Sequence, residues 1–251
     1  MKALQVFITA LGLLGGSSVL QAQRISLSRW EFGAGAGIFL YQGDLAPARF
    51  GGYKDPKLGL NLFVSRIMNA NLALRAQFSH STLKTDESDY SKPEWRQQRN
   101  LAFKTPLNEF SLLAVWHTNG DQMEEPNLKV LSPYIFAGGG LSVLNVRRDF
   151  TRFSSDYFNT QPSVIAGVAA DMAHRTPRVI PVIPVGAGVK YPVSTKVSLM
   201  AEASYRLGFN DYIDGVSQAA NPRKNDHYYS VSVGVTYRPF RNRGIGCPSV
   251  Q

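Results

Sequence analysis

The residues of this chain best suited to chemistry are four histidines and a single cysteine. The histidines are His80, His117, His174 and His227, and no two of them have the H-x-x-x-H spacing of helical zinc sites. Cys247 has no second thiol with which to build a cluster, and no Gly-x-Ser-x-Gly motif of a serine nucleophile occurs. We therefore expect no cofactor, no metal centre on these residues and no enzymatic activity.

Three aspartates, Asp211, Asp214 and Asp226, lie in a turn-rich, mostly polar stretch that begins at Asn210. Carboxylates are the oxygen ligands that calcium prefers. In turns, however, aspartate side chains more commonly accept hydrogen bonds from nearby backbone N–H groups. We therefore interpret the three aspartates as turn-capping residues rather than as a calcium site.

A second kind of charged pair lies in the stretch Val197–Ser217. Apolar residues alternate there with small or polar ones, which is the period of a β-strand with one apolar face. Glu202 and Arg206 share the other face with serine and glycine. The solvent face of a soluble sandwich would more often carry threonine, lysine and glutamine. The pattern therefore favours a transmembrane strand, with lipid on one side and a packed polar lumen on the other.

Arg75 and Glu109 occupy inward positions on two other predicted strands. An eight-stranded barrel is only wide enough for side chains to fill it, and charges buried there must be paired. Glu202 and Arg206 are separated by about 13 Å along their strand. We therefore expect them to meet through a shared lumen charge network with Arg75 and Glu109, which predicts a plugged lumen rather than a pore.

The same alternation recurs along the chain and predicts an all-β fold, an eight-stranded antiparallel transmembrane β-barrel of the outer membrane. Long connections alternate with tight turns, as in outer-membrane barrels with long outer loops and short periplasmic turns. The fourth connection, His117–Leu131, is an exception because it is long on the periplasmic side. Lys84–Asn100 is expected to be a loop, and Val146–Thr176 to be largely irregular. The expected strands are residues 29–41, 58–64, 72–82, 103–116, 132–145, 178–191, 197–208 and 228–240.

The composition is consistent with an exported membrane protein. The chain has 251 residues and a formal net charge of +9, but its basic residues are scattered, so we expect no nucleic-acid partner. Residues 1–22 combine Lys2, an apolar core and small residues, which indicates a signal peptide cleaved after Ala22. The apolar core is too short to span a bilayer comfortably. Residues 23–251 are then the barrel, in contact with outer-membrane lipid, with a short periplasmic C-terminal tail.

Three stretches carry a family resemblance. They are Arg99–Pro106 followed by Glu109, Glu202 and Arg206 followed by Asp211–Ser217, and the terminal Cys247–Pro248. They resemble the PorG-like family, the outer-membrane barrel component of the type IX protein secretion system. The resemblance spans most of the mature chain apart from Val146–Thr176. It implies a Gram-negative envelope barrel that anchors the periplasmic ring of the lipoprotein PorK and of PorN. That system exports proteins with C-terminal signals and supports gliding motility in gliding bacteria.

Cys247 is the residue for which we predict a partner. With eight strands both termini lie in the periplasm, an oxidising compartment where a lone cysteine is a free thiol or half of an intermolecular disulfide. Arg241 and Arg243 favour its reactive thiolate form. We expect Cys247 to crosslink to the ring lipoprotein, on the same side of the membrane as the acidic stretch Asp121–Glu125. An incidental free thiol remains the alternative.

Two other functions stay open. Eight-stranded outer-membrane enzymes that cleave lipid acyl chains exist, and His80 and Thr82 share a face near the outer end of the third predicted strand. A lipid-modifying enzyme would need that pair to be catalytic. An adhesin-like barrel would instead act through its surface loops. No catalytic pair is identified by the sequence.

Overall fold

The computed structural model describes residues 29–46, 51–119, 130–221 and 225–239. The predicted signal peptide, the acidic stretch 121–125 and the tail that carries Cys247 lie outside the described residues. Strands dominate the described part of the chain. None of the helices in these ranges is long and apolar enough to cross a membrane.

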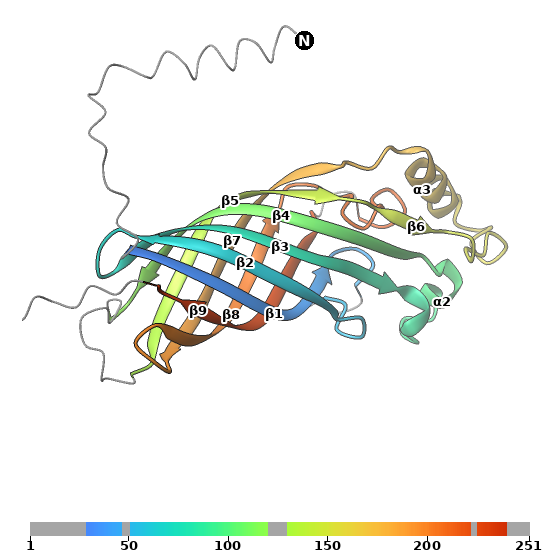
Figure 1. Cartoon of the computed structure of the whole chain (residues 1–251). Coiled ribbons are helices and arrows are strands. Elements are labelled where there is room, and N and C mark those ends of the chain that lie inside the picture. The colour runs from blue at the N-terminus through green and yellow to red at the C-terminus, as the bar shows by residue number, and fades with distance from the viewer. Residues whose placement is uncertain (1–28, 47–50, 120–129, 222–224, 240–251) are drawn as a thin grey trace, which may run out of the picture.

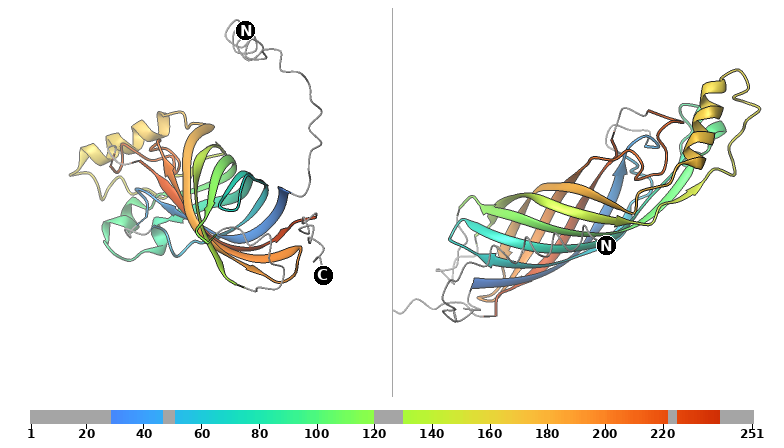
Figure 2. Two further views of the ribbon diagram at one scale, coloured as in Figure 1. Left: turned by 90° about the vertical axis from the view of Figure 1, so that its left-hand side faces the viewer. Right: turned by 90° about the horizontal axis from the view of Figure 1, so that it is seen from above.

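Eight long antiparallel strands form a closed barrel (Figures 1 and 2). Each strand pairs with the next long strand in the chain, and β9 pairs with β1 to complete the ring. The prediction of an eight-stranded antiparallel barrel is confirmed. The long strands are β1 (Trp30–Gln42), β2 (Lys57–Ile67), β3 (Leu72–Asp86), β4 (Ala102–His117), β5 (Ser132–Leu144), β7 (Val179–Pro192), β8 (Val197–Gly208) and β9 (His227–Tyr237).

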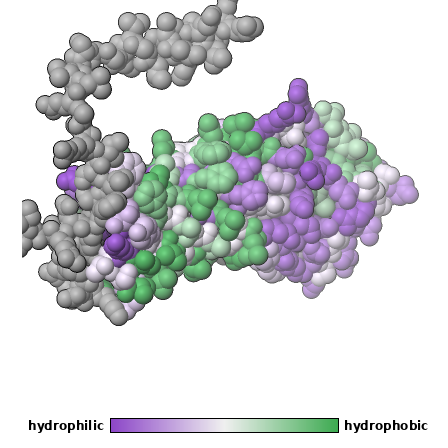
Figure 3. Space-filling view, viewed as in Figure 1, coloured by the Kyte–Doolittle hydropathy of each residue, from purple (hydrophilic) through white to green (hydrophobic). Residues whose placement is uncertain are grey.

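The two faces of the strands differ in polarity. Leu60 and Leu62 of β2 and Val233 of β9 are exposed on the outer wall, whereas Arg75 and Ser79 of β3 are buried inside. Figure 3 shows apolar residues around the middle of the barrel and polar ones over the end with the long connections. A closed barrel with an apolar outer belt has no unpaired backbone edge to expose to lipid. The chain is therefore an integral outer-membrane protein, and its short turns lie at the same end of the barrel as Arg29 and Pro239, the first and last described residues.

Inward-facing glycines make room for aromatic rings across the strand pairs. Gly33 lies directly opposite Phe63, and a Cβ atom added to Gly33 would overlap the Phe63 ring. Gly188 is paired with Tyr134 in the same manner, and its added Cβ would contact the Tyr134 ring at 2.5 Å. The glycine-rich strands therefore let a narrow lumen hold large side chains.

The hairpin of β3 and β4 continues beyond the apolar belt, which corrects the predicted boundaries. Its pairing runs from Leu72 and Trp116 to Asp86 and Ala102, so the third strand continues into residues 84–86, which were expected to belong to the loop Lys84–Asn100. The short strand β6 (Arg147–Asp149) pairs with the outer end of β4, and η2 (Glu87–Asp89) and α2 (Trp95–Arg99) follow β3. The outward residues of this extension are polar because they lie above the lipid, so the apolar alternation stops before the strand does.

The segment Val146–Thr176, expected to be largely irregular, contains β6 and the helix α3 (Pro162–Ala173). Pro162 occupies the first turn of α3, where its missing N–H group costs nothing. The carboxylate of Asp171 accepts hydrogen bonds from the backbone N–H groups of residues 217, 218 and 219 at 2.8–3.1 Å. The helix therefore fastens the connection between β8 and β9.

That connection, expected to be a mostly polar stretch, packs into the outer end of the barrel. Ile213 and Val216 are fully buried in an apolar cluster with Leu45 and Leu101. Thr105 Oγ1 of β4 donates to the Ile213 carbonyl at 2.8 Å. The outer mouth of the barrel is thus covered by its own last loop.

Candidate functional site

Charged residues inside the barrel lie in three layers along its axis. The layer nearest the periplasmic turns is centred on Glu31, whose carboxylate accepts from Lys190 Nζ at 2.6 Å and from Arg238 Nε at 2.7 Å. The sequence pattern placed Glu31 on the inner face, but Lys190 was missed. Its inward position follows from the alternation of β7, where the apolar outward residues are odd-numbered.

The middle layer pairs Arg75 of β3 with Glu202 of β8. Tyr134 of β5 donates its hydroxyl to the same Glu202 oxygen at 2.6 Å. The Arg75 guanidinium also lies 4.0 Å from the centre of the Phe63 ring. Arg75 is only 1% exposed, so its charge is neutralised within the protein rather than by solvent.

The third layer, nearest the outer end, pairs Arg206 of β8 with Glu109 of β4. Arg206 Nε donates to Glu109 Oε2 at 3.2 Å, and Tyr228 donates its hydroxyl to the same oxygen at 2.8 Å. Arg206 Nη1 donates to Ser230 Oγ at 2.5 Å, and Ser142 shares a 2.7 Å hydrogen bond with Tyr228. All five side chains are buried, and Glu109 Oε1 and Arg206 Nη2 are left without a hydrogen-bond partner among the described residues.

The structure brings the four predicted lumen residues inside the barrel as two separate pairs. Glu202 binds Arg75, and Arg206 binds Glu109. The expected meeting of Glu202 and Arg206 in one network is not seen among the described contacts. The reason is geometric: their separation along β8 exceeds the reach across this narrow lumen, so each finds a partner on another strand.

Outside the lipid belt, Asp214 and Asp226 share one tyrosine. Tyr41 Oη lies 2.5 Å from Asp214 Oδ2 and 2.7 Å from Asp226 Oδ1. One hydroxyl hydrogen cannot serve two carboxylates at once, so one of the two acids holds a proton. Burial raises the pKa of Asp226 to about 7 and that of Asp211 to about 6.

The same aspartates cap the backbone of the last loop. Asp214 Oδ1 accepts from Val216 N–H at 2.8 Å, and Asp226 Oδ2 accepts from Ile213 N–H at 3.0 Å. In the described ranges no group of three or more His, Cys, Asp or Glu side chains is arranged to hold a metal ion. The geometry is that of turn caps.

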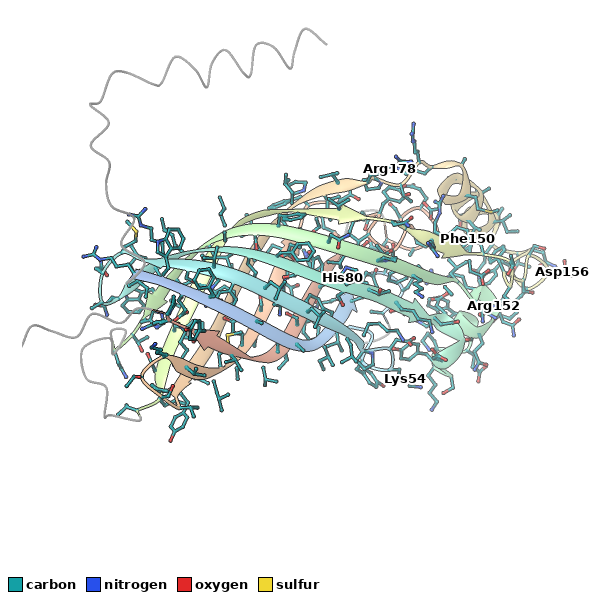
Figure 4. All side chains as sticks on the ribbon, in the orientation of Figure 1. Lys54, His80, Phe150, Arg152, Asp156 and Arg178 are labelled. Atoms are coloured by element: carbon teal, nitrogen blue, oxygen red, sulfur yellow. The ribbon has the colours of Figure 1, made fainter. Side chains whose placement is uncertain are left out.

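His80, labelled on β3 in Figure 4, faces outward. Its Nδ1 lies 2.8 Å from Oδ1 of Asn108, the residue directly opposite on β4. Thr82, which the sequence placed on the same face, is half-buried. His174, by contrast, stacks on Tyr212 at 3.9 Å, which is a packing role. Cys247, the predicted partner-binding residue, lies outside the described residues.

Comparison with known proteins gives a family and several barrels of similar architecture. A family model described as "Domain of unknown function (DUF6089)" matches residues 5–237. No curated protein matches the chain significantly.

Three of the solved structures that are similar to this chain follow. Neisserial surface protein A (NspA) is 16% identical, with 84% of this chain and 97% of that one covered and a TM-score of 0.48. The attachment invasion locus protein Ail of Yersinia pestis is 11% identical, with 83% and 96% covered and a TM-score of 0.43. The outer membrane protein OprG of Pseudomonas aeruginosa is 9% identical, with 83% and 94% covered and a TM-score of 0.44.

Proposed function

The chain belongs to the family described as DUF6089, and from that premise we propose that it is a non-enzymatic outer-membrane anchor, the PorG-like barrel of a type IX protein secretion system. Its partners in this proposal are the lipoprotein PorK and PorN, which form a periplasmic ring. The role is protein export and, in a gliding bacterium, motility.

The observation that carries the proposal is the filled lumen. Three layers of ion pairs cross the barrel, and the loop between β8 and β9 covers its outer mouth. Solute passage would require several buried charged pairs to separate, and each loss of one partner costs about 3–5 kcal/mol. A barrel closed in this manner is suited to holding a position in the membrane rather than to transport.

The motifs that carry the resemblance to the PorG-like family can be located in the structure. The first two of its three motifs lie together: Thr105 bonds to Ile213, and Glu109 pairs with Arg206. The motif residues therefore stabilise one region at the outer half of the barrel. Their role in this proposal is to stabilise the barrel, and the contact with the periplasmic ring is made by other residues.

The periplasmic turns present apolar side chains that suit such a contact. Met68, at the turn between β2 and β3, is 45% exposed, and Val193, at the turn between β7 and β8, is 49% exposed. Leu131, just before β5, is exposed as well. Apolar residues at turn tips are available to a protein docked beneath the barrel.

Affinity purification from detergent-solubilised outer membranes tests the proposal. The wild-type barrel should recover the ring proteins, and the double variant Met68→Asp with Val193→Asp should lose them. Met172→Asp on α3, an exposed methionine at the opposite end, is the matched control and should retain them. Failure of the wild-type protein to recover any ring component would overturn the anchor role.

A lipid-modifying enzyme is the second candidate, and the contact between His80 and Asn108 is the observation that favours it. An amide oxygen on Nδ1 orients an imidazole so that Nε2 can act as a base. Thr82 would be the nucleophile. Release of acyl chains from lipopolysaccharide by the wild-type barrel but not by His80→Ala would establish this activity in place of the anchor role.

A further inference from the structure

A pocket of about 480 Å³ opens at the outer end of the barrel, away from the lumen layers. Four segments distant in the sequence build it: the turn after β1, helix α2, the stretch that leads into α3, and the connection between β8 and β9. Their contributions include Asp44, Trp95, Tyr157, Gln161 and Asn221. The volume lies within the range of small-molecule sites, about 300–1,000 Å³.

The floor of the pocket is held rigidly by buried polar bonds. Arg99 donates to Glu87 through Nε at 2.9 Å and Nη2 at 2.5 Å, and through Nη1 to the Ala219 carbonyl at 2.9 Å. Arg96 donates to the Leu45 carbonyl at 3.0 Å. The turn after β1 and the connection between β8 and β9 are thereby both bonded to α2, so the pocket is preformed.

Two aromatic side chains form the exposed walls. Trp95 is 38% exposed, and the Arg99 guanidinium lies 4.8 Å from its ring centre. Tyr157 is 49% exposed and packs edge-on against the buried Phe158 at 4.9 Å. Both rings are supported from behind while part of each faces solvent. Exposed rigid rings of this kind are platforms for flat, partly apolar ligands.

Hydrogen-bonding groups surround these rings. Gln161 precedes α3 without using its side chain to cap the helix. Asn221 donates its backbone N–H to Asp44 Oδ2 at 2.9 Å, which places an amide and a carboxylate at the same edge. The pocket thus offers amide donors and acceptors and one carboxylate beside two aromatic faces.

The charges decide which ligand fits. Arg96 and Arg99 share Glu87, and Asp44 adds a second negative charge, so these four groups carry no net charge and an anion such as phosphate or sulfate meets no excess of cations. An acyl chain would contact the two aromatic rings but would make no hydrogen bond to the amides or the carboxylate around them. A neutral sugar ring presents C–H groups to an aromatic face and hydroxyls to amides and carboxylates.

We propose that this outer pocket binds a neutral saccharide, with Trp95 and Tyr157 stacking against the sugar ring and with Gln161, Asn221 and Asp44 binding its hydroxyls. The inference is independent of the anchor function, because the pocket lies at the opposite end from the periplasmic turns. The saccharide comes from the glycan of a surface lipid of the same membrane or from a free glycan outside the cell.

Tryptophan fluorescence of the folded full-length barrel tests the pocket. Trp30 and Trp116 lie at the periplasmic ends of β1 and β4, so a Trp30→Phe and Trp116→Phe background leaves Trp95 as the reporter. Neutral hexoses, N-acetylhexosamines and their oligosaccharides should change its emission, whereas inorganic phosphate should not. Tyr157→Ala should weaken binding roughly tenfold, which corresponds to about 1.4 kcal/mol. Tyr53→Ala, an exposed tyrosine outside the pocket, is the matched control and should bind normally.

Three further results complete the test. Binding to lipopolysaccharide vesicles but not to soluble oligosaccharides identifies the membrane's own glycan as the source, and the converse identifies an external one. The gel shift between boiled and unboiled samples establishes that each variant is folded. No emission change with any neutral glycan of a broad array, or equal binding by wild type and Tyr157→Ala, would overturn the proposal.

Discussion

Removing Glu202 is expected to destabilise the barrel severely, because it strands a charge in the lumen. Its Oε1 atom accepts from both Arg75 and Tyr134, and Arg75 is 1% exposed. Loss of one partner from a buried ion pair costs about 3–5 kcal/mol. Glu202→Ala should therefore lower the free energy of unfolding by about that amount. Loss of Arg152, labelled at the outer end in Figure 4, from its partly exposed pair with Asp86 should cost no more than about 1 kcal/mol.

A double-mutant cycle shows whether the assigned partner is the right one. Urea unfolding of the barrel in lipid vesicles, followed by the gel shift of the folded form, measures each variant. Arg75→Met with Glu202→Ala should cost clearly less than the sum of the two single changes, because no unpaired charge remains. Glu202→Ala with Arg206→Ala should be close to additive, because the two residues belong to different pairs. Additive losses in the Arg75 and Glu202 cycle would refute the pairing.

Three other predictions follow from the structure. Gly33→Ala should lower the free energy of unfolding by about 1–3 kcal/mol, because the added methyl group overpacks against Phe63. Gly139→Ala should leave the free energy of unfolding unchanged in the same assay, because no atom lies within 4 Å of the added Cβ. Equal effects of the two changes would contradict the proposed glycine–aromatic packing. The pKa of Asp226 is raised from its ordinary value of 3.8 to about 7, so the folded loop holds a proton that the unfolded loop releases. Stability of the loop should therefore fall as the pH rises from about 4 to about 7; hydrogen exchange in residues 210–221 measures this. Asp226→Asn should weaken the dependence without abolishing it, because burial also raises the pKa of Asp211 to about 6 and raises that of Asp214. Non-reducing gels of whole envelopes, prepared under thiol-trapping conditions, should show a heavier band that disappears with reductant and in Cys247→Ser; a monomer alone would exclude the disulfide.

The transmembrane part of the fold could be predicted because lipid imposes a simple pattern. Outward residues such as Leu60, Leu62 and Val233 recur at every second position along their strands. This alternation alone predicts that the segments are strands, which side chains face the lipid, and how many strands the barrel has. Above the lipid the constraint ends. The extension of β3 to Asp86 has polar residues outward, so nothing in its composition distinguishes it from a loop.

The inward position of the lumen charges was also predictable, but their partners were not. Alternation places Arg75, Glu109, Glu202 and Arg206 on the inner face. Which arginine pairs with which carboxylate depends on the offset between strands on opposite sides of the closed barrel. The sequence of a single strand does not determine that offset. The burial of residues 213–217 could not be predicted for another reason: the polar groups of this polar stretch are satisfied within the protein, by Asp171 and by the aspartates of the loop itself.

Conductance across a planar lipid bilayer tests the filled lumen most directly. The purified, refolded barrel should insert without producing stable ion currents, because the Glu31, Glu202 and Glu109 layers occupy its cross-section. Insertion can be verified independently by the gel shift and by protection from protease. A sustained, voltage-independent current through the wild-type barrel would contradict a closed lumen and, with it, the structural anchor role.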